Sequence, residues 1–306
     1  MRIGFFTDTF MPQHNGVVTS LLTSGQELVK RGHEVTVFCP KSKLKDFNGM
    51  KIFSYPAVTF RPYPEFKIAV PRGRDKIEEL DIVHSHSPFT MGFFGWRVSR
   101  SQKIPRVSTF HTLLSEYVRY LSLFGRKLLE KIAWQYCEAF YNHQHGIIAP
   151  SLVLKETLRD HGIEKPISVV PTGIDTNFFK RSKKETAREK LGMEKDEKIF
   201  LSLGRLSYEK NVDVILKAFK GIDGKLIIAG RGPAREKLNK IKIDLGLNDK
   251  VRLVGYVPEQ LKPLYYSAAD ALVIASTGRL KDWSSSSPWP VAAPLLAPNP
   301  LRWLRL

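Results

Sequence analysis

The sequence predicts an α/β protein with two domains, each built on a mostly parallel, doubly wound sheet. Short apolar runs typical of buried strands alternate with segments of helical spacing along most of the chain. At 306 residues the chain also exceeds the usual size of one domain, so two domains of about 150 residues each are expected. A charged stretch at 180–198 marks the boundary, which gives domains at 1–179 and 180–277. The composition changes again in a tail at 278–306 that is rich in Pro and Trp.

The first domain is expected to open with a strand, a helix and a second strand. These elements are predicted at 2–8, from about 17 to 30, and at 34–39, and further strands at 51–55, 82–86, 106–110, 145–149 and 168–170. This βαβ opening lacks a G-x-G-x-x-G loop, so a nicotinamide or flavin cofactor is not expected. Gly16 permits a close backbone approach where the first strand turns into the helix.

A glycine-led loop at 204–211 is the best candidate binding site. It follows an expected strand at 199–203 and precedes an expected helix at 212–219, and it carries Arg205 and Lys210. In an open α/β sheet, ligands bind where strands turn into helices, and a helix N-terminus favours anions. Two cations there predict a clamp for a phosphate or diphosphate, and the alternative is a loop of solvated charges. Strands at 225–229, 251–254 and 271–274 and helices at 234–245 and 259–267 continue the alternation, and Gly230 begins a second turn able to approach phosphate.

The overall charge narrows the classes of partner. Lys and Arg outnumber Asp and Glu by 48 to 30, so the chain carries +18 and favours nucleic acid, acidic lipid or a phosphorylated substrate. Nucleic acid is the weaker interpretation because no DNA- or RNA-binding signature accompanies the charge. No secretory signal or membrane-spanning run is recognised, and Cys39 and Cys137 have no metal-ligand spacing, so a cytoplasmic protein with buried thiols is expected.

Histidines follow or end some of the predicted strands. His84 and His86 would suit a metal site, but no third ligand has a compelling spacing, so strand-end histidines bonded to backbone are expected instead. His111 lies where ligands meet such sheets and is the better functional candidate. The basic and aromatic segment at 113–129 is either a helix on an anionic membrane surface or the edge of a helix that faces the core.

Several motifs together resemble a GT-B glycosyltransferase of the retaining family 4 type. In chain order they are PQHNGVVTS, HTLLSEYVRYL, APS, VVPTGID, LSLGRLSYEKN, IAGRGP, VGYVP and LYYSAADALVIAS, and they extend to about residue 277. The first and third look most like the branch that glucosylates diacylglycerol or related lipids at the cytoplasmic membrane face. The resemblance implies two Rossmann-like domains facing across a cleft, the second one incomplete here.

The same resemblance implies roles for individual residues. Its catalytic residues would be His111, which contacts the transferred sugar, with Arg205 and Lys210, which bind the donor diphosphate. Donor-side residues would also include Gly16, Gly173, Gly230, Val254, Gly255, Tyr256 and Val257, and acceptor-side residues Asn15 and Tyr117. The implied reaction moves glucose or mannose from a UDP- or GDP-hexose to a lipid or sugar acceptor with retention. No D-x-D triplet occurs, and two cations can replace a metal, so neither cofactor nor divalent ion is expected.

The chain departs from the family pattern after Thr277. Family members continue into an E-x7-E segment whose glutamates hold sugar and ribose hydroxyls, but no carboxylate occupies either position here. Codons that encode Arg279–Trp289 can be chosen so that the neighbouring frame reads TQGLVVLEPM, close to the family motif, which favours a frameshift. We therefore expect an impaired enzyme, or alternatively a non-catalytic remnant that binds nucleotide or anionic lipid.

Overall fold

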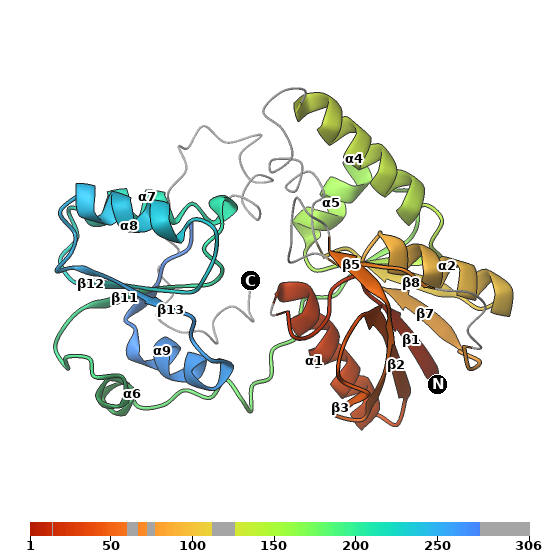
Figure 1. The fold of residues 1–306 in the computed structure, drawn as a ribbon, viewed down its shortest axis with the longest axis horizontal. Coiled ribbons are helices and arrows are strands. Elements are labelled where there is room, and N and C mark those ends of the chain that lie inside the picture. The colour runs from red at the N-terminus through yellow and green to blue at the C-terminus, as the bar shows by residue number, and fades with distance from the viewer. Residues whose placement is uncertain (14, 60–66, 72–76, 112–125, 276–306) are drawn as a thin grey trace. The chain divides into compact units, whose positions relative to one another are not determined.

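A computed structural model describes residues 1–13, 15–59, 67–71, 77–111 and 126–275 (Figure 1). The chain divides into two compact units, the first ending at Ile174 and the second beginning at Asp175. This division falls slightly before the boundary expected at 179. Each unit is described below by itself.

The first unit is built on an eight-stranded sheet with the order β10-β9-β8-β7-β1-β2-β4-β3. All neighbouring strands are parallel except β3, which runs antiparallel to β4. The strands are β1 (Arg2–Phe6), β2 (Glu34–Pro40), β3 (Asp46–Phe47), β4 (Met50–Tyr55), β7 (Ile82–Ser85), β8 (Arg106–Thr109), β9 (Gly146–Ala149) and β10 (Ile167–Val169). A separate antiparallel pair, β5 (Ala57–Thr59) and β6 (Lys67–Ala69), lies outside this sheet.

Helices cover both faces of the first sheet. They are α1 (Gly16–Lys30), α2 (Thr90–Gln102), α4 (Arg126–Tyr141) and α5 (Leu152–Asp160). Alternate residues of β1 point to opposite faces, so Phe5 packs in the cluster that contains Leu21 of α1, and Phe6 packs with Met91 of α2. Because both phenylalanines are fully buried, β1 is a central strand covered on two sides.

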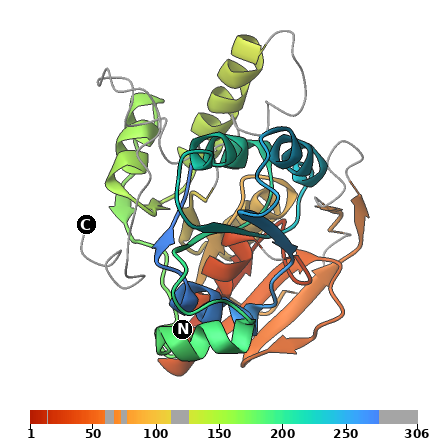
Figure 2. The ribbon, with the colours of Figure 1, turned by 90° about the vertical axis from the view of Figure 1, so that its left-hand side faces the viewer.

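The second unit has a four-stranded parallel sheet with the order β13-β12-β11-β14. Its strands are β11 (Ile199–Leu203), β12 (Lys225–Ala229), β13 (Val251–Gly255) and β14 (Ala271–Leu272). Its helices are α6 (Lys184–Leu191), η1 (Tyr208–Lys210), α7 (Val212–Phe219), α8 (Arg235–Asp244), η2 (Glu259–Leu261) and α9 (Lys262–Ala268). Figure 2 shows α7 and α8 on one side of this sheet and α6 and α9 on the other.

Two apolar layers hold the second sheet between these helices. Leu226 and Ile228 of β12 pack in the cluster formed by α7 and α8, whereas Ile227 and Ala229 pack in the opposite cluster beside Tyr265 of α9. This alternation is the period-2 pattern of a strand buried on both faces. It fixes the register of β12, and hence the places where the loops at its two ends emerge.

The expected strands and helices of the second unit are found at or near their predicted positions. β11, α7 and β12 have the predicted limits, while β14 is shorter than the expected 271–274. Within the charged stretch at 180–198, the structure has helix α6, whose Ala187 and Arg188 are buried. This stretch therefore belongs to the packed second unit.

Candidate functional site

Three loops at the carboxyl ends of β11, β12 and β13 lie against one another in the second unit. The Gly204 N–H donates to the Ala229 carbonyl over 2.9 Å, and the Gly230 N–H donates to the Gly255 carbonyl over 2.6 Å. The Leu206 N–H donates to the Arg231 carbonyl over 2.8 Å. These backbone bonds fix the glycine-led loops side by side at the edge where parallel α/β sheets bind ligands.

Glycine is required where these loops cross. A Cβ on Gly230 would lie 1.8 Å from the Gly204 carbonyl oxygen, and the φ of Gly230 is +150°. A Cβ on Gly232 would lie 2.2 Å from the Leu206 carbonyl oxygen. No side chain fits at either position without separating the loops, so the glycines permit the close backbone approach that the sequence predicts for Gly230.

Arg205 and Lys210 occupy the loop after β11, as the sequence predicts. Arg205 is half-buried beside Leu206, and Lys210 is exposed at the end of η1. The loop is ordered by its own contacts, because the Ser207 hydroxyl donates to Glu209 over 2.5 Å. Two cations on one ordered loop provide fixed positive charge at the carboxyl edge of the sheet.

The end of this loop is fixed to the neighbouring strand region. Asn211 adopts a left-handed backbone conformation with φ 46°, and its side-chain amide donates to the Ala275 carbonyl over 3.0 Å. Asn tolerates this conformation better than most residues. The contact joins the start of α7 to the segment that follows β14.

The loop after β13 presents one aromatic ring among the residues expected beside a nucleotide base. Tyr256 is 45% exposed, whereas Val257 is 6% exposed and Val254 is partly buried in the same apolar cluster. The two valines support the loop, and the ring of Tyr256 remains accessible. The Arg231 guanidinium lies 5.5 Å from the centre of that ring in a cation–π arrangement.

Arg231 is a candidate that sequence reasoning did not select. The available signal was its position between Gly230 and Gly232, directly after a predicted strand. Its side chain is exposed, so it adds a third cation to the carboxyl edge of the second sheet. The contact with Tyr256 depends on the pairing of β12 with β13, which the sequence alone does not specify.

In the first unit, the loop after β1 leads into the N-terminus of α1. Asn15 is the N-cap residue, and its side-chain oxygen accepts the Val18 N–H over 3.0 Å. Its amide nitrogen donates to the Thr9 hydroxyl over 2.8 Å. Gly16 is the first residue of the helix, and a Cβ there would meet no atom within 4 Å. Within the described residues the space above Gly16 is therefore open, which suits the close approach predicted for it.

A buried carboxylate that the sequence analysis did not single out joins β1 to α2. Asp8 is 1% exposed and accepts the hydroxyl protons of Ser87 over 2.5 Å and Thr90 over 2.7 Å. It also accepts the Met91 N–H over 3.1 Å at the start of α2. Burial raises the pKa of Asp8, and these hydrogen bonds oppose that rise. Asp8 is therefore a connection between strand and helix that fixes the carboxyl end of β1.

His84, His86 and His111 form a cluster at the carboxyl ends of β7 and β8, in which His86 is buried and the other two are partly buried. His86 Nδ1 lies 3.0 Å from His111 Nε2, and His84 Nε2 lies 2.7 Å from the Thr109 hydroxyl. The His84 and His86 rings stack with centres 4.2 Å apart, and the His86 and His111 rings lie nearly parallel with centres 5.2 Å apart. The expectation that His84 and His86 bond to backbone was wrong, because the neighbouring strands bring side-chain partners close enough.

Burial keeps these imidazoles neutral. Desolvation lowers the pKa of His84 to about 3 and that of His111 to about 4, and it lowers the pKa of His86 well below the ordinary value. The neighbouring histidines add to the lowering for His84 and His86. A neutral imidazole has one N–H donor and one bare nitrogen, so this cluster acts through hydrogen bonds.

Gly173 and Tyr117 are the predicted site residues that remain to be placed. Gly173 follows β10, where a Cβ would lie 3.4 Å from a methyl group of Thr23 in α1. Tyr117, predicted on the acceptor side, lies outside the described residues, as do most of the segment 113–129 and the tail at 278–306. Their predicted roles stay predictions.

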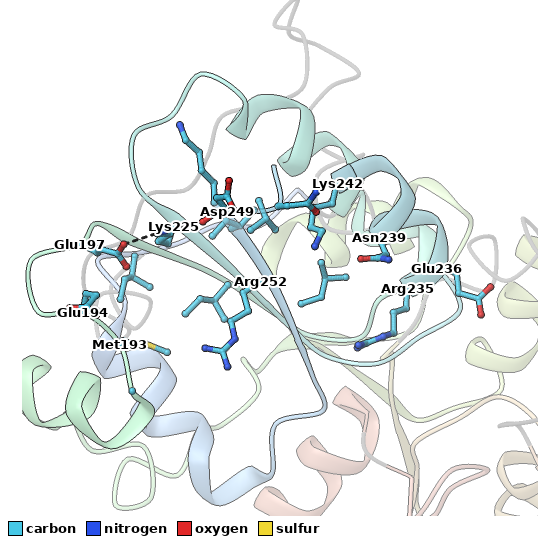
Figure 3. Close-up of a pocket in the computed structure, with 18 residues that line it drawn as sticks. Met193, Glu194, Glu197, Lys225, Arg235, Glu236, Asn239, Lys242, Asp249 and Arg252 are labelled. Atoms are coloured by element: carbon cyan, nitrogen blue, oxygen red, sulfur yellow. Dashed lines mark hydrogen bonds and ion pairs between the residues drawn. The ribbon is translucent and has the colours of Figure 1, made fainter. Parts of the chain in front are cut away.

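A pocket of about 650 Å³ lies away from the glycine loops of the second unit (Figure 3). It is lined at the amino ends of β11, β12 and β13 and along α8, and the Lys225 ammonium there pairs with Glu197 over 3.4 Å. Arg252 of β13 and Lys242 of α8 also line it. Most of its lining lies at the opposite end of the strands from the predicted donor residues, and Arg235 at the start of α8 borders both, since its guanidinium would lie 3.3 Å from a Cβ on Gly255.

The described part of the chain contains neither a candidate metal centre nor a candidate membrane span. No group of three or more His, Cys, Asp or Glu side chains comes together there in a way that would hold a metal ion. Likewise, none of the helices within the described ranges has the length and apolar character needed to cross a bilayer.

Comparison with known proteins agrees with the two-unit architecture. Residues 14–178 match the family model described as Glycosyltransferase Family 4, and residues 183–278 match the one described as Glycosyl transferases group 1. The first match alone covers more than half of the chain. The second match ends where the composition of the sequence changes.

The similarity to individual proteins agrees with these two family matches. The chain is 35% identical over 294 residues to an alpha-monoglucosyldiacylglycerol synthase of Streptococcus pneumoniae, covering 90% of this chain and 66% of that protein. It is 28% identical over 298 residues to the synthase of the same name from Acholeplasma laidlawii, covering 90% of this chain and 75% of that protein. The chain thus spans about two thirds of the length of the first of these relatives.

The fold has a solved counterpart. The structure of Anabaena HepE in complex with UDP and glucose superposes with a TM-score of 0.71 at 18% identity, covering 92% of this chain and 77% of that one. Such a likeness at low identity concerns the fold, and it agrees with two Rossmann-like units, each with a mostly parallel sheet between helices. The chain belongs to glycosyltransferase family 4 and has the GT-B fold of that family.

Proposed function

We propose that this protein transfers a hexose, with retention, from a nucleotide-sugar donor to a lipid acceptor, and that the donor binds at the glycine loops of its second unit. The observation that carries this proposal is the loop after β11, where Arg205 and Lys210 stand beside glycines that allow close backbone approach. Family membership supports the reaction class. The two relatives named as glucosyldiacylglycerol synthases support a glucose donor and a diacylglycerol-type acceptor.

The proposed chemistry follows from where charge develops. Breaking the glycosyl–diphosphate bond builds negative charge on the leaving diphosphate. Arg205 and Lys210, held in place before the reaction, stabilise that charge more in the transition state than in the ground state. His111 is neutral and serves as a hydrogen-bond partner for the transferred sugar. Tyr256, backed by Arg231, offers a ring on which the nucleotide base can stack.

Divalent metal has no role in this proposal. The two cations of the β11 loop neutralise the diphosphate where other enzymes use Mg²⁺ or Mn²⁺, so donor binding should survive a chelator.

A membrane surface supplies the acceptor in this proposal. The +18 charge favours anionic lipid, and α4 exposes Leu128 and Ile132. A peripheral position at the inner face of the cell membrane follows as part of the proposal.

Calorimetric titration of the protein with UDP-glucose and with GDP-mannose tests the donor site. Arg205→Gln and Lys210→Gln should each weaken binding of the preferred donor at least about tenfold, because each removes a charge-assisted hydrogen bond. Lys217→Gln removes the same charge from an exposed position on α7 and should leave the affinity unchanged. Unchanged binding in both loop variants would contradict the site, and loss of binding in EDTA would contradict metal independence.

The second candidate function is binding without turnover. The carboxylates of the E-x7-E pattern are missing after Thr277, so the charge clamp is present without the groups that hold sugar and ribose in the family. Transfer of labelled glucose to diacylglycerol, measured with this chain and with a version whose reading frame is restored after Thr277, separates the two. Transfer by the restored version alone supports the binding-only remnant, whereas transfer by both supports the enzyme.

A further inference from the structure

The His84–His86–His111 cluster contains one ring nitrogen with an unusual environment. His86 Nε2 is buried and has no hydrogen-bond partner among the described residues. His86 itself is 3% exposed, and the centre of its ring lies 4.2 Å from that of His84 and 5.2 Å from that of His111. The ring of Phe5 also contacts it edge-on, with centres 4.7 Å apart.

This environment selects between the two neutral forms of His86. If Nε2 carried the proton, an N–H would be buried among rings with no acceptor, and unpaired buried donors are rare in folded proteins. If Nδ1 carries it, the buried nitrogen is a bare acceptor, and the proton lies on the atom that faces His111 Nε2 at 3.0 Å. The second form places the only donor of the ring where a partner exists.

We propose that His86 is a positioning residue that donates its Nδ1–H to His111 Nε2 and thereby fixes the tautomer and ring orientation of His111. When Nε2 of His111 accepts this bond, its single proton must lie on Nδ1. His111 then offers Nδ1–H, a donor for an oxygen atom, and its ring lies nearly parallel to the His86 ring, with 17° between the two planes. In the opposite arrangement its Nδ1 would be an acceptor and would favour a different ligand.

The consequence for catalysis rests on the proposed function, because it assumes that His111 contacts a sugar hydroxyl. The tautomer of His111 does not depend on the proposed function, since it is measured on the protein without donor, acceptor or turnover. A failed transferase assay would therefore leave this inference testable, and a wrong tautomer would leave the donor site of the second unit untouched.

Two-bond ¹⁵N–¹H correlation spectra of the uniformly ¹⁵N-labelled chain at pH 7 report the tautomer of each histidine. Protonated and bare ring nitrogens have well-separated ¹⁵N shifts, and the signals of His111 are identified by their absence in His111→Gln. The expected result is a bare Nε2 and a protonated Nδ1 for His111, and the same assignment for the two nitrogens of His86. A protonated Nε2 in His111 would overturn the proposal.

Variants separate positioning from simple packing. His86→Asn places an amide N–H near the former Nδ1 and should keep His111 in the Nδ1–H form, whereas His86→Leu removes the donor and should give a mixture of both tautomers. His84→Gln alters the neighbouring ring but leaves the His86–His111 bond, so it should not change the His111 spectrum. If His86→Leu retains the wild-type tautomer while circular dichroism shows it folded, His86 does not set it.

Discussion

The glycines at the crossing of the β11 and β12 loops carry the geometry of the proposed donor site at the scale of single residues. A methyl group on Gly230 would overlap the Gly204 carbonyl oxygen, with 1.8 Å between the two atoms. The overlap involves backbone, so no side-chain rotation relieves it. The two loops would have to separate, although the Gly204–Ala229 and Leu206–Arg231 backbone bonds hold them together.

Gly230→Ala should therefore destabilise the second unit by about 1–3 kcal/mol from overpacking, with added backbone strain at φ +150°. Urea unfolding followed by circular dichroism measures this loss. Gly221→Ala is the matched control, because a Cβ at Gly221 meets no atom within 4 Å. Equal unfolding midpoints for the two variants would show that the loops adapt at no cost.

Single residues also show what the sequence could and could not predict. Arg205, Lys210 and Gly230 were found because each lies in a loop bounded by a clear strand and helix, so local pattern was sufficient. The bond between His86 and His111 joins residues 25 positions apart and depends on the parallel pairing of β7 with β8. Arg231 and Tyr256 meet only because β12 pairs with β13. Contacts between strands require the topology, which a single sequence leaves open.

At the scale of elements, α6 shows how a charged segment becomes part of a core. Arg188 is 2% exposed: its guanidinium donates to the Ala268 carbonyl over 3.0 Å and pairs with Asp270 over 2.8 Å. Asp270 also accepts the Ile199 N–H over 2.7 Å and pairs with Lys184. Charge is buried here because every group has a partner, and the sequence pattern of apolar spacing gives no sign of it.

Asp270→Asn should lower the free energy of unfolding by about 1–3 kcal/mol at pH 7, less than for a fully buried pair, because the Asp270 side chain is 31% exposed and Arg188 keeps its carbonyl acceptors. Burial raises the pKa of Asp270, but its bonds to Lys184, Ile199 and Arg188 outweigh this and lower it overall. The contribution is therefore complete above the unfolded value of about 3.9 and is lost as pH falls through the lower folded value.

The measurement is the urea midpoint of both proteins from neutral pH downward. The gap between wild type and Asp270→Asn should be constant above about pH 5 and shrink below about pH 4. Asp223→Asn serves as the control, since Asp223 is 95% exposed and lies 3.8 Å from Lys198. Such a surface pair contributes at most about 1 kcal/mol. A gap that widens in acid would contradict the assigned direction of the shift.

Helix α4 is the element on which the membrane proposal depends. Leu128 is 63% and Ile132 is 50% exposed, one turn apart on the same face, with the exposed Lys131 between them. A helix face of this kind can insert apolar side chains between headgroups while the lysine contacts anionic lipid.

The double variant Leu128→Gln and Ile132→Gln should reduce binding to phosphatidylglycerol vesicles at least about tenfold, because burying each apolar side chain contributes about 1.5–3 kcal/mol. Vesicle sedimentation measures the bound fraction, with phosphatidylcholine vesicles as the uncharged comparison. Ile243→Gln removes an equally exposed isoleucine from α8 and should not affect binding. Equal binding of the wild type, the double variant and Ile243→Gln would exclude α4 as the membrane contact.

At the scale of the whole molecule, two family matches account for residues 14–178 and 183–278. The amino-acid composition changes where the second match ends. The local signals before that point were consistent with one another, which is why strands, helices and family could all be predicted from the sequence. After it, local composition and family pattern disagree. A frameshift near Thr277 explains both observations with one event, because it replaces the coding frame without altering the preceding codons.

This explanation predicts the nucleotide sequence over Arg279–Trp289. Read in the neighbouring frame, these codons should encode TQGLVVLEPM, and this restricts several synonymous choices, such as TCG TCC TCG AGC for Ser284 to Ser287. The two tryptophan codons at Trp283 and Trp289 allow no freedom and already fit. Sequencing the gene tests the prediction, and peptides of the protein from its natural source, identified by mass spectrometry, show which frame is translated. Serine codons of another pattern would exclude a frameshift as the cause, because the family motif would then be absent from every frame.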